Sequence, residues 1–231
     1  MGKSEEEHAL ELVLSQLNKI GRERRLRVGF DIDDTVAETS NVVKNVLEER
    51  HGFDFTLSGR KFDWSASGVK DKHFIEIYSE LWAEDGVRIK PLLSKDTYEK
   101  LSSSVDFSFV SARDDASAEG LRRWLERHYG KEVKVAIVEP RPYDMHGIRK
   151  LEQGFDIIVD DSPHVAATMS SELARDHALL LVDKWEEAIN RRHRPNTAIV
   201  RDAEHAANVI FEAQKLQPEV KEKDGAGFLI V

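Results

Sequence analysis

Residues 26–35 read LRVGFDIDDT, and this stretch decides the fold. Its first half is a short apolar run, which predicts a buried strand, and its second half holds three carboxylates and a hydroxyl. Open α/β folds build their active sites at the carboxyl ends of parallel strands, so we expect the acidic side chains at such an edge. Carboxylates this close repel one another unless a cation lies among them, and Mg²⁺ is a hard cation that takes oxygen ligands.

The spacing Asp-x-Asp-x-Thr, formed by Asp31, Asp33 and Thr35, allows more than metal binding. Alternate residues leaving a strand can direct two carboxylates at one substrate. Asp31 would then attack a phosphorus atom, and Asp33 would handle the proton of the leaving group. A chain with 43 acidic residues also contains such spacings by chance, so a pair of solvated turn residues is the alternative.

Two further strand patterns end in polar residues. Residues 105–111 form a β-prone run that ends at Ser111, whose hydroxyl could donate a hydrogen bond to a phosphoryl oxygen. Residues 155–161 form an apolar run that ends in the adjacent carboxylates of Asp160 and Asp161, with a proline two residues later. For Ser111 the alternative is a turn serine before the helix predicted over residues 115–129.

Lys150 lies on a short predicted helix before the second acidic pair. From there its ammonium could neutralise a nucleophilic aspartate and hold a phosphate as a point charge. The alternative is a solvated helix residue, and the neighbouring Arg149 could take the same place.

The order strand–Asp-x-Asp-x-Thr, strand–Ser, Lys, strand–Asp-Asp resembles the four-motif signature of the haloacid dehalogenase superfamily of phosphotransferases, over roughly residues 26–163. The resemblance implies that Asp31 is the nucleophile and Asp33 the general acid/base. The phosphate-binding residues that it implies are Thr35, Ser111 and Lys150. The Mg²⁺ ligands that it implies are Asp31, Asp33 (through its backbone carbonyl), Asp160 and Asp161. Asp34 departs from the pattern, since many relatives carry a small residue such as glycine there.

Among the subfamilies, the chain looks like the 5′(3′)-deoxyribonucleotidase group. This resemblance implies a Mg²⁺-dependent phosphomonoesterase that forms an aspartyl-phosphate and acts on a small phosphate ester, with a nucleoside monophosphate as one candidate. The alternatives are a phosphatase of sugar or other metabolite phosphates and a non-catalytic phosphate-binding regulatory protein. A dehalogenase or a phosphomutase would use the same Asp31, but Asp33 favours phosphoryl chemistry.

Strand and helix patterns alternate along the chain, which predicts an α/β, Rossmann-like, mostly parallel sheet with helices on both faces. We expect residues 1–35 and 105–231 to form the core domain and residues 36–104 an inserted helical cap. The predicted cap helices begin after Thr39 or Ser40 and near residue 71. A receiver-type regulatory domain also gathers acidic residues around Mg²⁺, but it needs no such insertion.

Three cap aromatics are candidates to stack on a flat leaving group: Phe62, Trp64 and Trp82. Packing between cap and core is the simpler interpretation, because aromatic side chains dominate protein cores. The cluster at residues 22–25, RERR, is interpreted as a solvated linker, with an anionic substrate as a possible neighbour.

Composition narrows the partners. A net charge of −9 argues against nucleic-acid polymers and anionic membranes, and leaves a small phosphate substrate and a possible homo-oligomer. The chain has no cysteine, no run near the ~20 apolar residues of a membrane span and no signal-peptide pattern, so we expect a cytoplasmic protein. The nine histidines show no ligand spacing for zinc, and the Gly-x-x-x-x-Gly-Lys loop of nucleotide triphosphatases is absent from the sequence.

Overall fold

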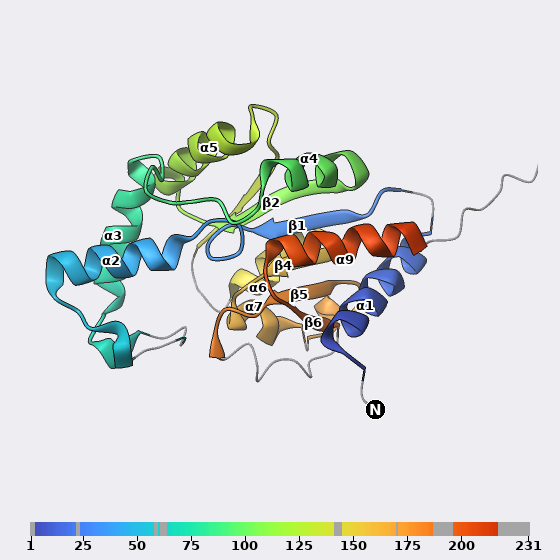
Figure 1. The fold of residues 1–231 in the computed structure, drawn as a ribbon, viewed down its shortest axis with the longest axis horizontal. Coiled ribbons are helices and arrows are strands. Elements are labelled where there is room, and N and C mark those ends of the chain that lie inside the picture. The colour runs from blue at the N-terminus through green and yellow to red at the C-terminus, as the bar shows by residue number, and fades with distance from the viewer. Residues whose placement is uncertain are drawn as a thin grey trace, which may run out of the picture.

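The computed structural model describes residues 3–21, 24–57, 60, 64–140, 145–169, 171–186 and 196–216. Its centre is a six-stranded parallel sheet with the strand order β3-β2-β1-β4-β5-β6 (Figure 1). The strands are β1 (Arg27–Asp31), β2 (Asp106–Ala112), β3 (Val135–Val138), β4 (Ile157–Asp160), β5 (Ala178–Val182) and β6 (Thr197–Val200). The predicted fold class is confirmed, and the described strands are all parallel.

Helices connect the strands and cover the sheet. The α-helices are α1 (Glu5–Ile20), α2 (Thr39–His51), α3 (Asp71–Ala83), α4 (Lys95–Ser104), α5 (Asp115–Tyr129), α6 (His146–Glu152), α7 (Pro163–Thr168) and α9 (Ala203–Leu216). Short 3₁₀ turns lie at Phe55–Leu57, Ser65–Ser67 and Glu172–Ala174. Local sequence explains the helix ends: Ser4 caps α1 in a capping box with Glu7, and Asp114 caps α5.

Strand alternation divides the core between the two faces of the sheet. On β4, Ile157 and Val159 join the apolar cluster that contains side chains of α1 and α9, whereas Ile158 joins the cluster under α6 and α7. Strands β4 and β5 are buried on both faces, as expected for the centre of a parallel sheet between helical layers. Figure 1 shows α1 and α9 in front of the sheet.

Most predicted elements are confirmed within one or two residues. The sequence pattern was wrong in three places. Thr39 lies inside α2, and Glu38 precedes the helix without a side-chain cap. The sequence after the second acidic pair also predicts one helix over residues 165–174, but the structure has two short turns there, α7 and Glu172–Ala174. Helix α4 was missed because its polar composition hides the apolar face.

Helices α2 and α3 lie beyond the carboxyl ends of the strands (Figure 1). Gly120 on α5 allows α3 to approach, because a Cβ there would lie 1.6 Å from the carbonyl oxygen of Trp82. Helix α4 packs against β2 and α9, on the sheet itself. The division into a core and an insertion over residues 36–104 stays a prediction.

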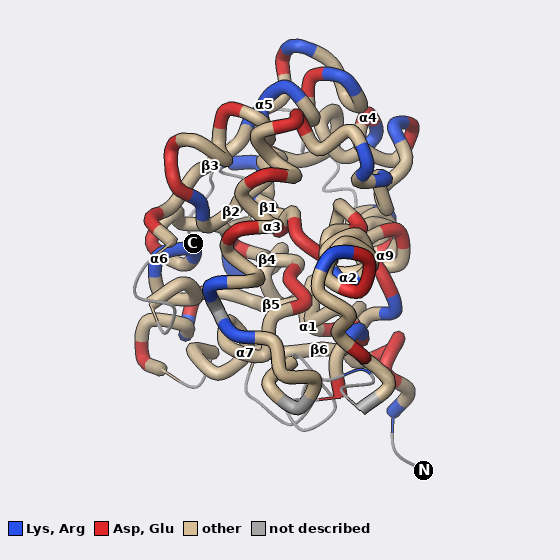
Figure 2. Tube along the Cα trace, turned by 90° about the vertical axis from the view of Figure 1, so that its left-hand side faces the viewer, with Lys and Arg blue, Asp and Glu red and all other residues tan. Residues whose placement is uncertain are grey.

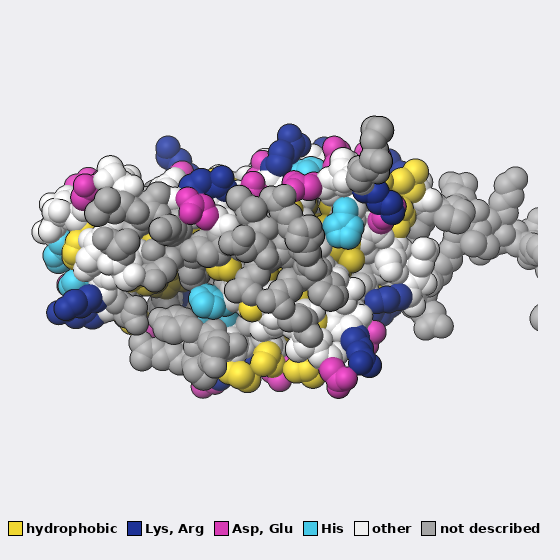
Figure 3. Space-filling view, turned by 90° about the horizontal axis from the view of Figure 1, so that it is seen from below, with side chains coloured by type: hydrophobic (Ala, Val, Ile, Leu, Met, Phe, Trp, Pro, Cys, Tyr) yellow, Lys and Arg dark blue, Asp and Glu magenta, His cyan; other side chains and the backbone are white. Residues whose placement is uncertain are grey.

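The face of the molecule seen in Figure 3 has no large continuous apolar patch among its described residues. In Figure 3, which shows the molecule from below, the apolar side chains form small groups separated by charged side chains and by atoms that are not described. Among the described helices, none is long and apolar enough to cross a membrane.

Candidate active site

The sequence order of the strands reverses beside β1, and the predicted acidic residues meet there. Asp31 ends β1, and Asp160 ends the neighbouring β4 and is followed by Asp161. One carboxylate oxygen from each of the three residues lies within 4.8 Å of the others, and all three side chains are buried. This convergence at a topological switch point is the arrangement that the sequence predicted.

Lys150 spans the two strands. Its Nζ donates to Asp31 Oδ1 at 2.7 Å and to Asp160 Oδ2 at 2.6 Å, and only 4% of the residue is exposed. Burial opposes the charged ammonium, but the two carboxylates outweigh it, so the pKa of Lys150 is raised. The neighbouring Arg149 instead pairs with Glu139 at 2.9 Å. The structure therefore selects Lys150 over Arg149 as the cation of the acidic group.

The acidic group carries more negative charge than Lys150 neutralises. Burial raises the pKa of Asp31 to about 7 against the opposing effect of Lys150, and the charges of Asp160 and Asp33 act in the same direction as burial. Burial also raises the pKa of Asp161 well above its usual range, aided by the charges of Asp34, Asp160 and Asp31. A divalent cation among these oxygens would favour their charged forms, so the donor set fits a hard metal ion.

Asp33 lies outside this set and is held by three donors. Thr39 Oγ1 donates to its Oδ1 at 2.7 Å, and its Oδ2 accepts from Tyr78 OH at 2.8 Å and from Arg113 Nη2 at 2.7 Å. Tyr78 belongs to α3, whereas Arg113 is the residue directly after the last residue of β2. The carboxylate of Asp33 thus joins α3 to the sheet through charge-assisted hydrogen bonds.

Arg113 also positions Ser111. Its Nε donates to Ser111 Oγ at 2.8 Å, which leaves the hydroxyl hydrogen of Ser111 to donate elsewhere. The guanidinium carbon lies 4.0 Å from the centroid of the Trp82 ring, and the side chain has no exposed surface. Within the described chain, Nη1 of Arg113 is buried without a hydrogen-bond partner. Such a donor is expected to gain a partner when a ligand occupies the site.

The carboxylate of Asp34 is bound by Ser40 and Lys184. The residue adopts a left-handed conformation with φ 62°, which aspartate tolerates better than most residues. Its carboxylate accepts from Ser40 N at 2.9 Å and from the hydroxyl of Ser40, and it forms an ion pair with Lys184. A glycine at this position could not form these contacts. Through them, Asp34 connects the start of α2 to the loop after β5.

Thr35 and Trp185 hold Asp161. Thr35 Oγ1 donates to Asp161 Oδ1 at a long 3.4 Å, and Trp185 Nε1 donates to Asp161 Oδ2 at 2.5 Å. The Trp185 ring also lies beneath the ammonium of Lys184, at 5.3 Å from its centroid. Among the described residues, the hydroxyl of Thr35 therefore contacts a carboxylate and supports the acidic group.

Comparison with solved structures identifies the architecture. A candidate phosphoglycolate phosphatase from Lactobacillus plantarum aligns with a TM-score of 0.56 and 13% identity, over 80% of this chain and 99% of that chain. A candidate haloacid dehalogenase-like hydrolase from Burkholderia xenovorans aligns with a TM-score of 0.53 and 12% identity, over 83% and 99%. The chain has the haloacid dehalogenase-like fold. A candidate β-phosphoglucomutase from Bacteroides vulgatus aligns with a TM-score of 0.50 and 15% identity, over 90% and 98%.

No protein-family model matches this sequence, and no curated protein matches it. At these identities the likeness establishes the haloacid dehalogenase-like fold, and the chemistry has to be argued from the residues themselves.

Two of the three aromatic residues proposed for stacking lie in packing contacts. Trp82 has no exposed surface and packs against Trp124, and Trp64 is 7% exposed and packs edge-on against Phe55 and Phe74. Neither ring offers a free face for stacking, so for both residues the packing interpretation is confirmed. Phe62, the third candidate, lies outside the described residues.

Sequence reasoning missed Tyr78, Arg113 and Trp185 as parts of the site. Arg113 had a usable signal, because it lies two residues after Ser111 at the end of the same strand. Tyr78 and Trp185 had none, since each comes from a helix or loop whose approach to the candidate site depends on tertiary packing.

Proposed function

We propose that this chain is a phosphomonoesterase of the haloacid dehalogenase superfamily. The observation that carries the proposal is the meeting of Asp31 with Lys150, Asp160 and Asp161 in one buried group, with Asp33 two residues further along the chain. This arrangement combines a nucleophile, fixed positive charge and a second carboxylate that is placed to move protons. The fold of the similar structures is consistent with it.

In the proposed reaction, a carboxylate oxygen of Asp31 attacks the phosphorus in line, and the bond from phosphorus to the leaving oxygen breaks. Asp33 gives a proton to that oxygen, so the alcohol leaves neutral. Asp33 then takes a proton from water, whose oxygen attacks the aspartyl-phosphate and releases inorganic phosphate. Ser111 and Lys150 stabilise the charge on the equatorial phosphoryl oxygens, the main catalytic contribution expected in phosphoryl transfer.

The two carboxylate oxygens of Asp33 differ, since Oδ1 accepts from Thr39 alone whereas Oδ2 accepts two hydrogen bonds. In this structure its Oδ2 accepts from both Tyr78 and Arg113, so no free position faces a leaving group on that oxygen. A substrate would therefore displace the hydroxyl of Tyr78, or shift α3, to reach this oxygen. The cap would thus regulate the acid/base residue directly as well as exclude water.

The proposed metal is Mg²⁺, held by Asp31, Asp160 and Asp161 with the backbone carbonyl of Asp33. When bound, it supplies positive charge to the phosphoryl oxygens. The support is the three buried carboxylates, whose ligand oxygens lie within 4.8 Å of one another and carry more negative charge than one lysine balances.

The proposed substrates are small soluble phosphate esters. Nucleoside monophosphates are the narrower candidate from the resemblance to the deoxyribonucleotidases. The burial of Trp64 and Trp82 supports sugar and other metabolite phosphates instead, because these two rings provide no free stacking surface. Phosphoglycolate and phosphoglucose appear only in the names of structurally similar proteins.

The test is a panel of about fifty phosphate esters assayed for phosphate release with Mg²⁺, and with Asp31→Asn as the control. Turnover of at least one ester that disappears in the variant is expected. Binding of phosphate without turnover of any ester would leave the non-catalytic alternative. A preference for nucleoside monophosphates over sugar phosphates by more than about tenfold would establish the narrower class.

A further inference from the structure

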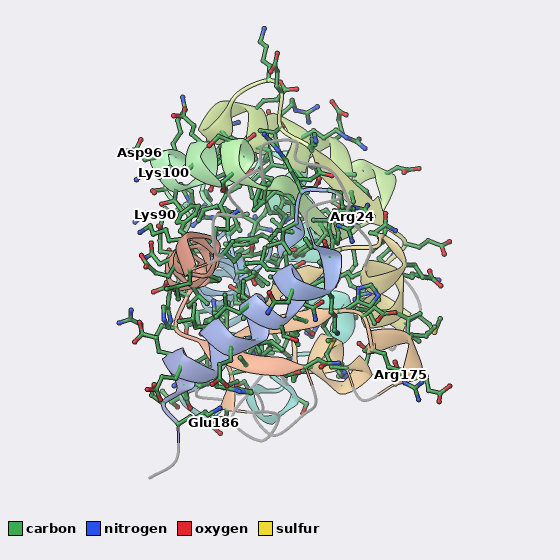
Figure 4. The ribbon with its side chains drawn as sticks, turned by 90° about the vertical axis from the view of Figure 1, so that its right-hand side faces the viewer. Arg24, Lys90, Asp96, Lys100, Arg175 and Glu186 are labelled. Carbon is green, nitrogen blue, oxygen red and sulfur yellow. The ribbon has the colours of Figure 1, made fainter. Side chains whose placement is uncertain are left out.

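Of the basic cluster at residues 22–25, the structure describes Arg24 and Arg25, and these two lie away from the acidic group. Arg24 and Arg25 immediately precede β1, whose first residue is Arg27 and whose last is Asp31. They therefore belong to the amino end of the sheet, opposite the candidate active site, and the interpretation that they neighbour its substrate is wrong. Figure 4 looks onto this end of the molecule and labels Arg24 there.

A cavity of about 310 Å³ opens beside these arginines, between the starts of β1 and β2 and the end of α4. Four of its lining side chains are cationic and two are carboxylates. The cations are Arg24, Arg25, Arg27 and Lys134. Ser102 and Tyr98 add hydroxyl groups to the lining, and no described residue forms a hydrogen bond with the hydroxyl of Tyr98.

The positive charge of this cavity is only partly neutralised. Arg24 forms a two-pronged pair with Asp156, with both distances 2.6 Å, and Lys134 pairs with Asp106 at 2.8 Å. The guanidinium of Arg27 donates to the backbone oxygen of Gln153. Among the described residues, neither Arg27 nor Arg25 has a carboxylate partner.

The carboxyl group of Asp106 lies among these positive charges. Its pKa is lowered, first by the hydrogen bond from Lys134 and further by the charges of Lys134, Arg27 and Arg25. An anion at the same place is favoured for the same reason. This local field is opposite in sign to the net charge of −9 of the whole chain.

Arg24 also lines a second cavity, of about 490 Å³, together with Gln16 on α1. Gln16 is 1% exposed, and its Nε2 has no hydrogen-bond partner among the described residues. A buried donor without a partner is unfavourable, so a polar ligand or ordered water in this cavity would be stabilised. Gln16 therefore favours a polar occupant in this second cavity, which shares only Arg24 with the first.

We propose that the cavity lined by Arg25, Arg27, Lys134 and Ser102 binds a small multivalent oxyanion, which makes it a second ligand site that is separate from the acidic group. The ligand class is a phosphate monoester, pyrophosphate or polycarboxylate, whose oxygens match the planar donor arrays of the two arginines. A volume near the lower limit of ligand pockets, about 300 Å³, admits such a molecule and excludes a polymer segment. The proposal does not depend on phosphatase activity.

The test is a titration of the full ¹⁵N-labelled chain with pyrophosphate or citrate, in EDTA, followed by amide chemical shifts. Saturable shifts are expected at the amides of residues 25–27 and 105–107. Shifts at residues 31–35 and 111 report binding at the acidic group, so the two sites are read separately in one experiment. Raising the salt should weaken the first set, because exposed charges are screened within about 10 Å at 0.1 M.

The double variant Arg25→Gln/Arg27→Gln should weaken binding by at least about tenfold, since each tenfold change corresponds to about 1.4 kcal/mol. The matched control Arg50→Gln/Arg122→Gln removes two exposed arginines elsewhere and should leave the affinity unchanged.

If the double variant does not fold, Arg25→Gln alone, at an exposed position, should still weaken binding. Shifts confined to residues 31–35 and 111, a titration without saturation, or equal weakening in the control would each overturn the site. Comparison of the two probes shows whether phosphates or carboxylates are preferred.

Discussion

The two ends of the sheet carry opposite charges in opposite environments. At the carboxyl end, Asp31, Asp160 and Asp161 are at most 6% exposed and lie around one buried ammonium. At the amino end, Arg24 and Arg25 are exposed, and the half-exposed side chain of Arg24 forms an ion pair with Asp156. Figure 2, which looks onto the carboxyl end, shows acidic segments around the ends of β1 and β4.

The difference shows that burial determines what a cluster of charges requires. Buried carboxylates cannot be hydrated, so they need a proton, an ammonium or a metal ion. Exposed guanidinium groups stay hydrated, so they can remain without a bound ligand at little cost in folding free energy. Strand β1 is only five residues long, from Arg27 to Asp31, and it joins the arginine-rich end of the sheet to the buried acidic group. The predictions below test this contrast, beginning with the largest expected effect.

Replacing an aspartate by asparagine should abolish turnover at the carboxyl end of the sheet and leave turnover unchanged at the amino end. Asp31→Asn should lower turnover by more than about 10³-fold, because the amide cannot attack phosphorus. Asp106→Asn, at the start of β2, is the matched control and should leave turnover unchanged. Phosphate release is measured for both folded proteins, and Asp31→Asn turnover above about a tenth of the wild-type rate would contradict the covalent mechanism.

Removing the metal should affect only the buried end. Chelation should abolish phosphate release and lower the melting temperature, because the carboxylates then repel one another. The pKa of Asp31 is raised to about 7, so the metal-free folded state binds protons that the unfolded state has released. The free energy of unfolding should therefore fall as the pH rises from about 4 to about 7.

Mg²⁺ competes with those protons, so its stabilising effect should be larger at pH 8 than at pH 5. Thermal unfolding at both pH values, with EDTA or with Mg²⁺, measures this difference. A metal effect that is equal at both pH values would show that the acidic group is already ionised in the metal-free protein.

Asp33→Asn should separate the two chemical steps. With an activated aryl phosphate the leaving group needs little protonation, so formation of the aspartyl-phosphate should slow less than its hydrolysis. A burst of released phenol followed by a steady state about 10²-fold slower than the wild-type rate is the expected trace. Equal slowing of both steps without a burst would assign the base to another group.

The hydroxyl of Tyr78 should matter more than that of Tyr98. Tyr78→Phe removes the donor that a substrate would have to displace from Asp33 Oδ2, so turnover should rise by about tenfold, consistent with 1.5–3 kcal/mol for a hydrogen bond to a charged group. Tyr98→Phe, at the amino-end cavity, removes a hydroxyl without a described hydrogen-bond partner and should leave turnover unchanged. Steady-state kinetics of both variants at saturating substrate distinguish them.

The smallest effect is expected at the exposed pair. Arg24→Gln should lower the free energy of unfolding by less than about 1 kcal/mol, since Arg24 is half exposed and Asp156 keeps its hydrogen bond from the backbone of Arg27. Urea unfolding measures this change, and turnover should be unaffected. A loss of several kcal/mol would show that this end is as strongly coupled as the buried one.

Sequence patterns predicted the features that depend on local order. The apolar runs that end in Asp31, Ser111 and Asp160 located three neighbouring strands, and their shared direction brought Asp31 and Asp160 together. The position of Lys150 followed from the helix before β4, although the choice against Arg149 required the structure. These predictions succeeded because parallel strands bring their ends to one edge.

The contacts between α3 and the sheet could not be predicted in the same way. Tyr78 reaches Asp33 across 45 residues of sequence, and Trp185 reaches Asp161 from the loop after β5. Neither distance is set by a period of helix or strand. The packing role of Trp82 likewise depended on Gly120, which a sequence pattern treats only as a weak point in a helix.

Asp34 has a consequence for how α2 can move. Its carboxylate joins the backbone of Ser40 at the start of α2 to the ammonium of Lys184, and its own backbone is left-handed. Separating α2 from the sheet at this point would break a charge-assisted contact before the helix could swing. Under the proposed function, this contact would have to break whenever α2 moved away to admit a substrate or release phosphate.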